Sequence, residues 1–266
     1  SSSLIVNKYP DMSIRIGELF GLNLNRFNFL IFSNFAYTSM IFAIPLIYYF
    51  KNLNKIKYIL IFLICFVSLF LLDARGPFLA SLIVLFLIPF FFNFSMKWQF
   101  FFLAFLFIIP FITNGILVLL NLNSPDILSL LSRREAIWNI TIENYTPSTF
   151  QFLFGYGYIG QFSSGISELY SEFFPGYGNQ EQISVHNSYL QILLDYGLLG
   201  LITLFYVILS LIKKFKLDMN IEYYLIVVFL IICGITDLSI QPNNLNILTA
   251  FLVLSNYNKT NFLKLT

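Results

Sequence analysis

The sequence predicts an all-α integral membrane protein with about seven transmembrane helices and one large extracytoplasmic loop. First, 58% of its 266 residues are hydrophobic and only 11% are charged, whereas soluble domains carry about 25% charged residues. Second, apolar runs of about 20 residues recur, and such runs cross a bilayer as helices because lipid offers no partner for backbone N–H and C=O groups. Third, one long polar break, residues 121–186, separates two groups of these runs.

The expected elements follow in chain order. Residues 1–26 mix charged and apolar groups and are expected to form an extracytoplasmic segment. Residues 27–120 hold four apolar runs, bounded by lysines or by a turn, which we interpret as transmembrane helices. Residues 187–266 hold three more, the last of them short, and then a cytoplasmic tail. The predicted spans are 27–50, 58–72, 78–94, 99–120, 187–212, 221–240 and 245–257.

The lysines orient these spans. If the lysine-bearing ends are cytoplasmic, seven alternating spans fit and nine of the ten lysines lie inside, as the positive-inside rule expects. The chain then begins outside, which implies an odd number of earlier spans if the native N-terminus is cytoplasmic. Because it also begins without methionine or a signal peptide, we expect a fragment of a longer chain. The inner lysines are Lys51, Lys55, Lys57, Lys97, Lys213, Lys214, Lys216, Lys259 and Lys264.

All the arginines fall on the outer side, against that rule. A guanidinium offers a planar fork of donors that matches phosphate oxygens and is never deprotonated, so their placement indicates an anionic ligand. Arg75 lies 17 intervening residues beyond Lys57, about 26 Å along a helix, and is expected near the outer interface, where an ionisable group is usually functional. The alternative is a snorkelling arginine paired with Asp73. The five are Arg15, Arg26, Arg75, Arg133 and Arg134.

The large loop begins with a second arginine site. Arg133 and Arg134 precede a stretch with Trp138 that is typical of a helix lying on the membrane, with Ser132 as its N-cap. Adjacent helical residues point about 100° apart, so one of the two arginines is expected to face a shared pocket, and the sequence leaves open which. The alternative is two solvated charges beside a tryptophan interface anchor.

A glycine run and the only histidine complete the loop. Gly155, Gly157 and Gly160 permit tight backbone geometry, and Tyr156 among them could stack on sugar rings, so we expect a flexible turn region. His186 ends the loop. A lone histidine is more often structural than catalytic, yet histidine can take a proton near neutral pH.

No residue spacing in the sequence is typical of a metal site. Cys65 and Cys233 lie inside apolar runs, as small core hydrophobes do, and the acidic residues are scattered. We therefore expect no metal and no cofactor, with arginine neutralising any phosphate.

Three segments together resemble the O-antigen ligase and O-antigen polymerase family. Val185–Gly200 resembles its C-terminal signature, Arg134–Trp138 its R-x-x-x-W segment, and Ala74–Gly76 its S-R-G motif. The likeness spans about residues 10–255. Ala74 stands where the family has serine, and Arg133 stands where it has glycine, which keeps the choice between Arg133 and Arg134 open.

The resemblance implies a GT-C-like glycosyltransferase of the bacterial inner membrane with its active site on the periplasmic face. By that likeness the donor is an undecaprenyl-diphosphate-linked oligosaccharide and the acceptor a glycan or lipid-linked glycan, with the lipid bilayer as surroundings and no nucleic acid. Arg75 and Arg134 would hold the diphosphate, and His186 would activate the acceptor hydroxyl. The expected substrate-binding residues are Arg133, Trp138, Gly155, Tyr156, Gly157, Asn187 and Tyr189.

The leading hypothesis is a polymerase that joins lipid-linked repeat units into O-antigen, capsule or exopolysaccharide. A ligase that moves finished polymer onto lipid A-core needs the same donor-side residues and stays open. A transporter or flippase for the lipid-linked glycan is the alternative of another class. Transporters usually carry polar groups or broken helices near the bilayer midplane, whereas these spans are nearly free of charge away from their outer ends.

Overall fold

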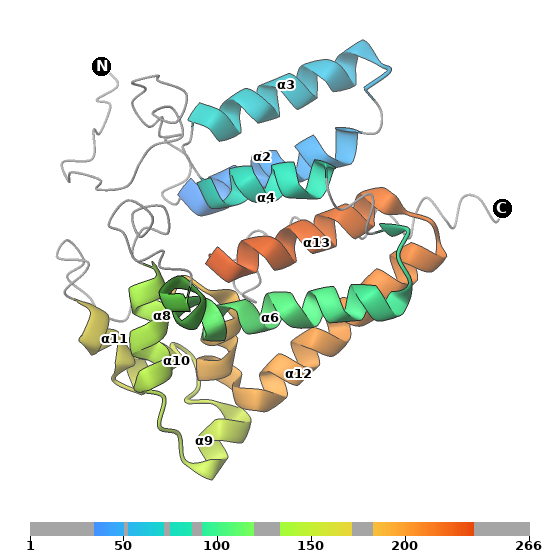
Figure 1. Cartoon of the computed structure of the whole chain (residues 1–266). Helices are drawn as coiled ribbons and strands as arrows, with labels where there is room; N and C mark the ends of the chain where they lie inside the picture. Colours follow the sequence, from blue (N-terminus) through green and yellow to red (C-terminus); the bar gives the residue numbers. More distant parts are fainter. Residues whose placement is uncertain are drawn as a thin grey trace, which may run out of the picture. The chain divides into compact units, whose positions relative to one another are not determined.

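Every regular element that the structure, a computed structural model, describes is a helix (Figure 1). The all-helical class is thus confirmed for this part of the chain. The predicted span at 245–257, the first residues of the span at 27–50 and Arg133 lie outside it. The described residues are 35–50, 53–71, 75–86, 92–119, 134–171 and 183–236.

The chain divides into two compact units, which are described separately. The first comprises Ser1–Phe94, Lys214–Cys233 and Ser239–Thr266, and the second comprises Ser95–Lys213 and Gly234–Leu238.

The first unit is held together by aromatic contacts between apolar helices. Its helices are α2 (Phe35–Phe50), α3 (Ile56–Leu71), α4 (Arg75–Phe86) and most of α13 (Ile221–Thr236). Tyr49 stacks on Tyr58 at 4.9 Å between ring centroids and so joins α2 to α3. Tyr48 of α2 meets Tyr223 of α13 edge to face at 6.1 Å. Such pairs stabilise by about 0.5–1.5 kcal/mol beyond the area they bury.

The third predicted span, 78–94, begins later than the observed helix. Arg75 was expected in the turn after the second span, but it is the first residue of α4, which is described as far as Phe86; residues 87–91 lie outside the described residues. Pro77, which was expected to mark the turn, lies in the first turn of α4, where a proline is tolerated because the first N–H groups have no intrahelical partner.

Among its described residues, the second unit contains two long helices and four short ones. The long ones are α6 (Met96–Leu119) and α12 (Ser188–Leu217). The predicted loop, where described, folds into α8 (Arg134–Glu143), α9 (Thr149–Phe154), α10 (Gly160–Ser163) and α11 (Ile166–Tyr170). Helix α8 packs against α6 and α11, and α11 packs against α10. The helix predicted in this stretch is therefore present as α8, within a small folded region. Its position on a membrane stays a prediction, and its expected N-cap, Ser132, lies outside the described residues.

Among the described helices, α12 is the one long and apolar enough to cross a membrane by length and composition. Five shorter apolar helices of 10–17 residues accompany it. The predicted count of seven spans and the loop's side of the membrane stay predictions.

Helix α12 is broken at Gly197, whose φ of 67° and ψ of −163° are not helical. Before the break, Ser188–Asp195 are all buried in the second unit, whereas Leu199, Ile202 and Tyr206 beyond it are exposed. The fifth predicted span, 187–212, therefore consists of a buried first segment and a longer apolar segment.

Candidate functional site

The end of α13 brings two predicted site residues to neighbouring backbone groups. The Ile235 carbonyl accepts a hydrogen bond of 2.6 Å from Nδ2 of Asn187, and the Thr236 carbonyl accepts one from Nη1 of Arg134. The last four carbonyls of a helix have no intrahelical partner and carry a partial negative charge, so amide and guanidinium donors satisfy them. Arg134 and the residue next to His186 are thus fixed at consecutive positions of one helix end.

Asn187 also begins α12. Its Oδ1 accepts from the backbone N–H groups of Tyr189 and Leu190, at 2.9 Å each, which is the geometry of an N-cap. The side chain is fully buried, at 0% exposed. One amide therefore caps the start of α12 with its oxygen and the end of α13 with its nitrogen.

Trp138 fixes the chain just before His186. It lies about one turn after Arg134 on α8, is 2% exposed, and donates from Nε1 to the Val185 carbonyl at 3.1 Å. Because buried polar groups are costly without a partner, this contact holds α8 against residue 185. The R-x-x-x-W spacing noted in the sequence thus puts its arginine and its tryptophan on one face of α8, where the arginine contacts Thr236 and the tryptophan contacts Val185.

His186 lies between two buried residues and is itself half-buried. Its φ of 49° is in the left-handed region, which non-glycine residues adopt rarely and histidine more readily than most. Its backbone N–H lies 3.4 Å from Oγ of Ser184. Backbone strain of this kind costs on the order of 1–3 kcal/mol and persists only where surrounding contacts impose it. Here the neighbouring contacts of Val185 and Asn187 impose it.

The glycine run packs against the break in α12. Since Gly197 interrupts the helical ladder, the carbonyls of Leu194 and Asp195 accept instead from Tyr156 N at 2.7 Å and Gly157 N at 3.1 Å. A Cβ on Gly155 would lie 2.4 Å from the Asp195 backbone, closer than atoms can approach. The run was expected to be a flexible turn, but Gly155 is held tightly, and it is glycine because two backbones meet there.

A buried polar network that the sequence did not single out supports this junction. Oδ1 of Asp195 accepts from the Gly160 N–H at 2.7 Å and from Nε2 of Gln191 at 2.8 Å. The same Gln191 nitrogen lies 2.5 Å from Oε1 of Gln161. Gln191 and Asp195 are four residues apart and share one helix face. That spacing was the available signal, although it does not reveal the partner loop.

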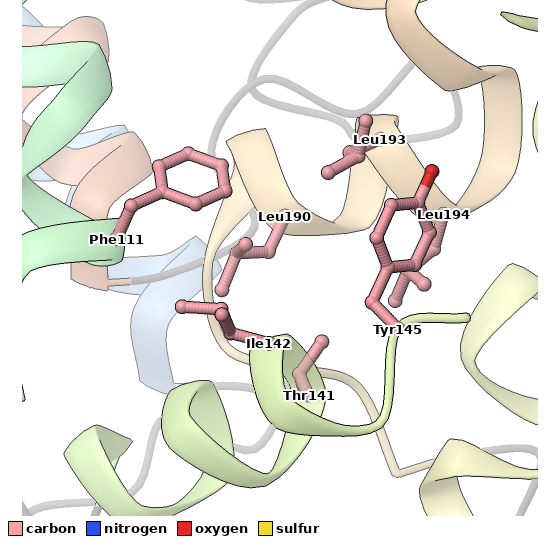
Figure 2. A pocket seen from close by; sticks show the side chains of 7 residues that line it. All are labelled: Phe111, Thr141, Ile142, Tyr145, Leu190, Leu193 and Leu194. Atoms are coloured by element: carbon pink, nitrogen blue, oxygen red, sulfur yellow. The ribbon is translucent and has the colours of Figure 1, made fainter. Parts of the chain in front are cut away.

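A small apolar cavity lies between α6, α8 and α12 (Figure 2). Its volume is about 40 Å³, too little for a sugar ring. Figure 2 shows the Tyr145 ring beside the α12 leucines; its hydroxyl is buried with no hydrogen-bond partner among the described residues. Burial, and secondarily the nearby Tyr156, raise the pKa of Tyr145. No predicted site residue lines the cavity, whose walls are Phe111, Thr141, Ile142, Tyr145, Leu190, Leu193 and Leu194.

The remaining predicted site residues lie in different surroundings. Tyr189 is fully buried, and the centroid of its ring lies 4.3 Å from the centroid of the Phe107 ring. Tyr156 is half-buried, and Gly157 is exposed. Arg75 is the first residue of α4, in the first unit. Their roles toward substrate stay predictions, and the structure joins Arg134, Trp138, His186 and Asn187.

The structure shows a helical protein in which Arg134 and Asn187, the residue after His186, donate to the last carbonyls of α13, and its apolar helices favour a membrane protein. A family model described as O-antigen ligase matches residues 60–205, more than half of the 266 residues. The chain therefore belongs to the O-antigen ligase family, which confirms the resemblance noted from its motifs. Membership implies ligase- or polymerase-type activity on lipid-linked glycans in polysaccharide biosynthesis. No curated protein and no solved structure matches the chain.

Proposed function

We propose that this protein is a polymerase that transfers glycan from an undecaprenyl-diphosphate-linked donor to a sugar hydroxyl, at the periplasmic face of the bacterial inner membrane and without a metal. The observation that carries the proposal is the attachment of Arg134 and of Asn187, the residue after His186, to the Thr236 and Ile235 carbonyls. It supports a shared site for an anion-binding group and a proton acceptor.

The reaction assigns one role to each group. The bond between the donor's anomeric carbon and its diphosphate oxygen breaks, and a bond forms from that carbon to the acceptor oxygen. His186 takes the proton that the acceptor hydroxyl loses. Arg134, with Arg75 as a second predicted contributor, balances the negative charge on the departing diphosphate. A guanidinium has five N–H donors, so one arginine can hold a backbone carbonyl and an anionic group together.

The rate enhancement that these groups can supply is sufficient for this reaction. A lipid diphosphate is a good leaving group, so the protein has to supply mainly charge stabilisation and positioning. One positioned donor to a developing charge contributes ~10²–10³ in rate, and a general base contributes about 10²–10⁴.

The buried members of the predicted substrate-binding set act as positioning residues in this proposal. Asn187, Trp138, Tyr189 and Gly155 are closed in by protein contacts, so they hold the catalytic segment in place. The predicted contacts with sugar are then made by Tyr156 and Gly157, which follow Gly155, and by Arg133, which precedes α8.

A ligase that transfers finished polymer to lipid A-core is the second candidate. The description of the matching family as O-antigen ligase favours it. Polymerase and ligase share the donor and differ in the acceptor.

The test is transfer in vitro by the full chain in lipid nanodiscs, with a synthetic undecaprenyl-diphosphate oligosaccharide and excess chelator. A ladder of products from donor alone supports the polymerase, while product only after addition of lipid A-core identifies the ligase. His186→Ala is expected to abolish either product while the thermal midpoint is retained. A requirement for divalent metal would contradict the arginine scheme, and near-normal turnover by His186→Ala would remove the base assignment.

A further inference from the structure

Helix α9 is apolar, yet none of its residues is buried. The segment around it, residues 144–167, contains no Asp, Glu, Lys or Arg. Large aromatic side chains cover it, and Phe150 and Phe154 lie side by side with ring centroids 4.8 Å apart. We call the following four residues the α9 aromatic surface: Phe150, Phe152, Phe154 and Tyr158, which are 69%, 42%, 51% and 71% exposed. An exposed apolar surface of this kind marks an interaction site.

The α9 aromatic surface is fixed to the break in α12. A Cβ on Gly197 would lie 2.5 Å from the Leu153 carbonyl group and 2.6 Å from the Gly155 nitrogen. Just after α9, the N–H groups of Tyr156 and Gly157 donate to the carbonyls of Leu194 and Asp195, which attaches the C-terminal end of α9 to the residues before the break. The depth of Gly197 in the bilayer therefore sets the depth of α9.

The length of α12 places Gly197 at a membrane surface. From Leu198 to its end at Leu217 the helix has 20 residues, about 30 Å, which equals the thickness of the hydrocarbon core. Lysines occupy its last turns, as expected at a membrane boundary. The large side chains just beyond the break, Leu199 and Ile202, are 44% and 55% exposed and so suit contact with lipid.

We propose that the α9 aromatic surface inserts into the bilayer interface, with its phenylalanines among the upper acyl chains and Tyr158 at headgroup level. Aromatic side chains concentrate at this level of the bilayer, and interfacial helices bury an apolar face about 5–10 Å deep. Tyr196, the residue before Gly197, is exposed as well and adds an aromatic side chain at the break to which α9 is fixed. Three of its four residues have no polar side-chain atom, which favours lipid over a glycan, whose hydroxyls require hydrogen-bonding partners. The proposal does not depend on the transfer reaction.

The test is the depth of a fluorescent label on α9. Phe150→Cys and Phe154→Cys are made separately in a background with Cys65→Ala and Cys233→Ala, so that the dye cannot react with the two native cysteines, both of which are buried thiols. Each is labelled with an environment-sensitive dye in the full chain, in nanodiscs of phosphatidylglycerol and phosphatidylethanolamine. Glu143→Cys, at an exposed charged position at the end of α8, is the matched control.

Labels at both α9 positions are expected to emit at shorter wavelength than the control. They should lose most of their emission to a nitroxide quencher near the glycerol end of the acyl chains and little to aqueous iodide, with the reverse at the control.

Equal quenching by iodide at all three positions would overturn the proposal. Protection from iodide quenching that appears only with added donor oligosaccharide would assign the surface to glycan and overturn it. Protection from iodide quenching that depends on protein concentration in detergent would assign the surface to a second copy of the chain and would also overturn it.

Discussion

Substitution of Asn187 separates the two contacts that its amide makes. Asn187→Ala removes the N-cap of α12, which costs about 1 kcal/mol. It also leaves the buried Ile235 carbonyl without its donor, which costs about 1–3 kcal/mol. The expected destabilisation is therefore about 2–4 kcal/mol.

Asn187→Ser is the matched variant. Its hydroxyl can still accept from the N–H groups at the start of α12, but it is too short to reach the Ile235 carbonyl. We expect Asn187→Ser to recover about 1 kcal/mol relative to Asn187→Ala, and to remain about 1–3 kcal/mol below the wild type. Both variants should also slow glycan transfer, since His186 follows the position of its neighbour.

The assay is the thermal midpoint of the purified full chain in nanodiscs, followed by intrinsic fluorescence, with transfer rates measured on the same samples. The expected order of stability is wild type, then Ser, then Ala. If alanine were as stable as the wild type, or serine no better than alanine, Asn187 would not join the two helix ends, and the reasoning that fixes His186 through it would fail.

Four further substitutions test other parts of the site. Gly160→Ala would bring a Cβ to 2.4 Å from the Leu194 carbonyl and should cost about 3 kcal/mol because backbone is the obstacle; Gly157→Ala, with nothing within 4 Å, should cost about 1–2 kcal/mol through its positive φ alone, and equal thermal midpoints would refute the packing. Tyr145→Phe removes a buried hydroxyl without a described partner and should leave stability unchanged or raise it, so a loss above about 1 kcal/mol would reveal a missed hydrogen bond. Arg134→Lys should reduce transfer by ~10²–10³ at normal expression, since a point charge does not replace a planar fork, and full activity would refute the clamp.

The sequence predicted the helical class better than the mutual placement of its candidate site residues. Composition alone revealed the apolar helices, and the motif resemblance singled out Trp138, His186 and the Arg133–Arg134 pair, with the choice between the two arginines left open. What it could not reveal was the end of α13, which was expected near residue 240 and lies at Thr236. The hydrogen bonds at that end come from side chains 48 and 102 residues away in the sequence, and no local pattern predicts such partners.

The break in α12 shows the same limit. A single glycine within an apolar helix is a weak signal, and the break at Gly197 requires the partner loop that satisfies the freed carbonyls. By contrast, α9 could have been found, because Ser148 and Gln151 form a capping box that the S-x-x-Q spacing announces. The sequence analysis predicted only a flexible turn region here, from Gly155, Gly157 and Gly160.

The separation of roles between Arg134 and His186 is tested most directly by phosphorus NMR of an undecaprenyl-diphosphate donor titrated with the full chain in nanodiscs and excess chelator. The account predicts a shift of the diphosphate resonances with wild type and with His186→Ala, and loss of that shift with Arg134→Ala. An unchanged shift with Arg134→Ala would contradict it.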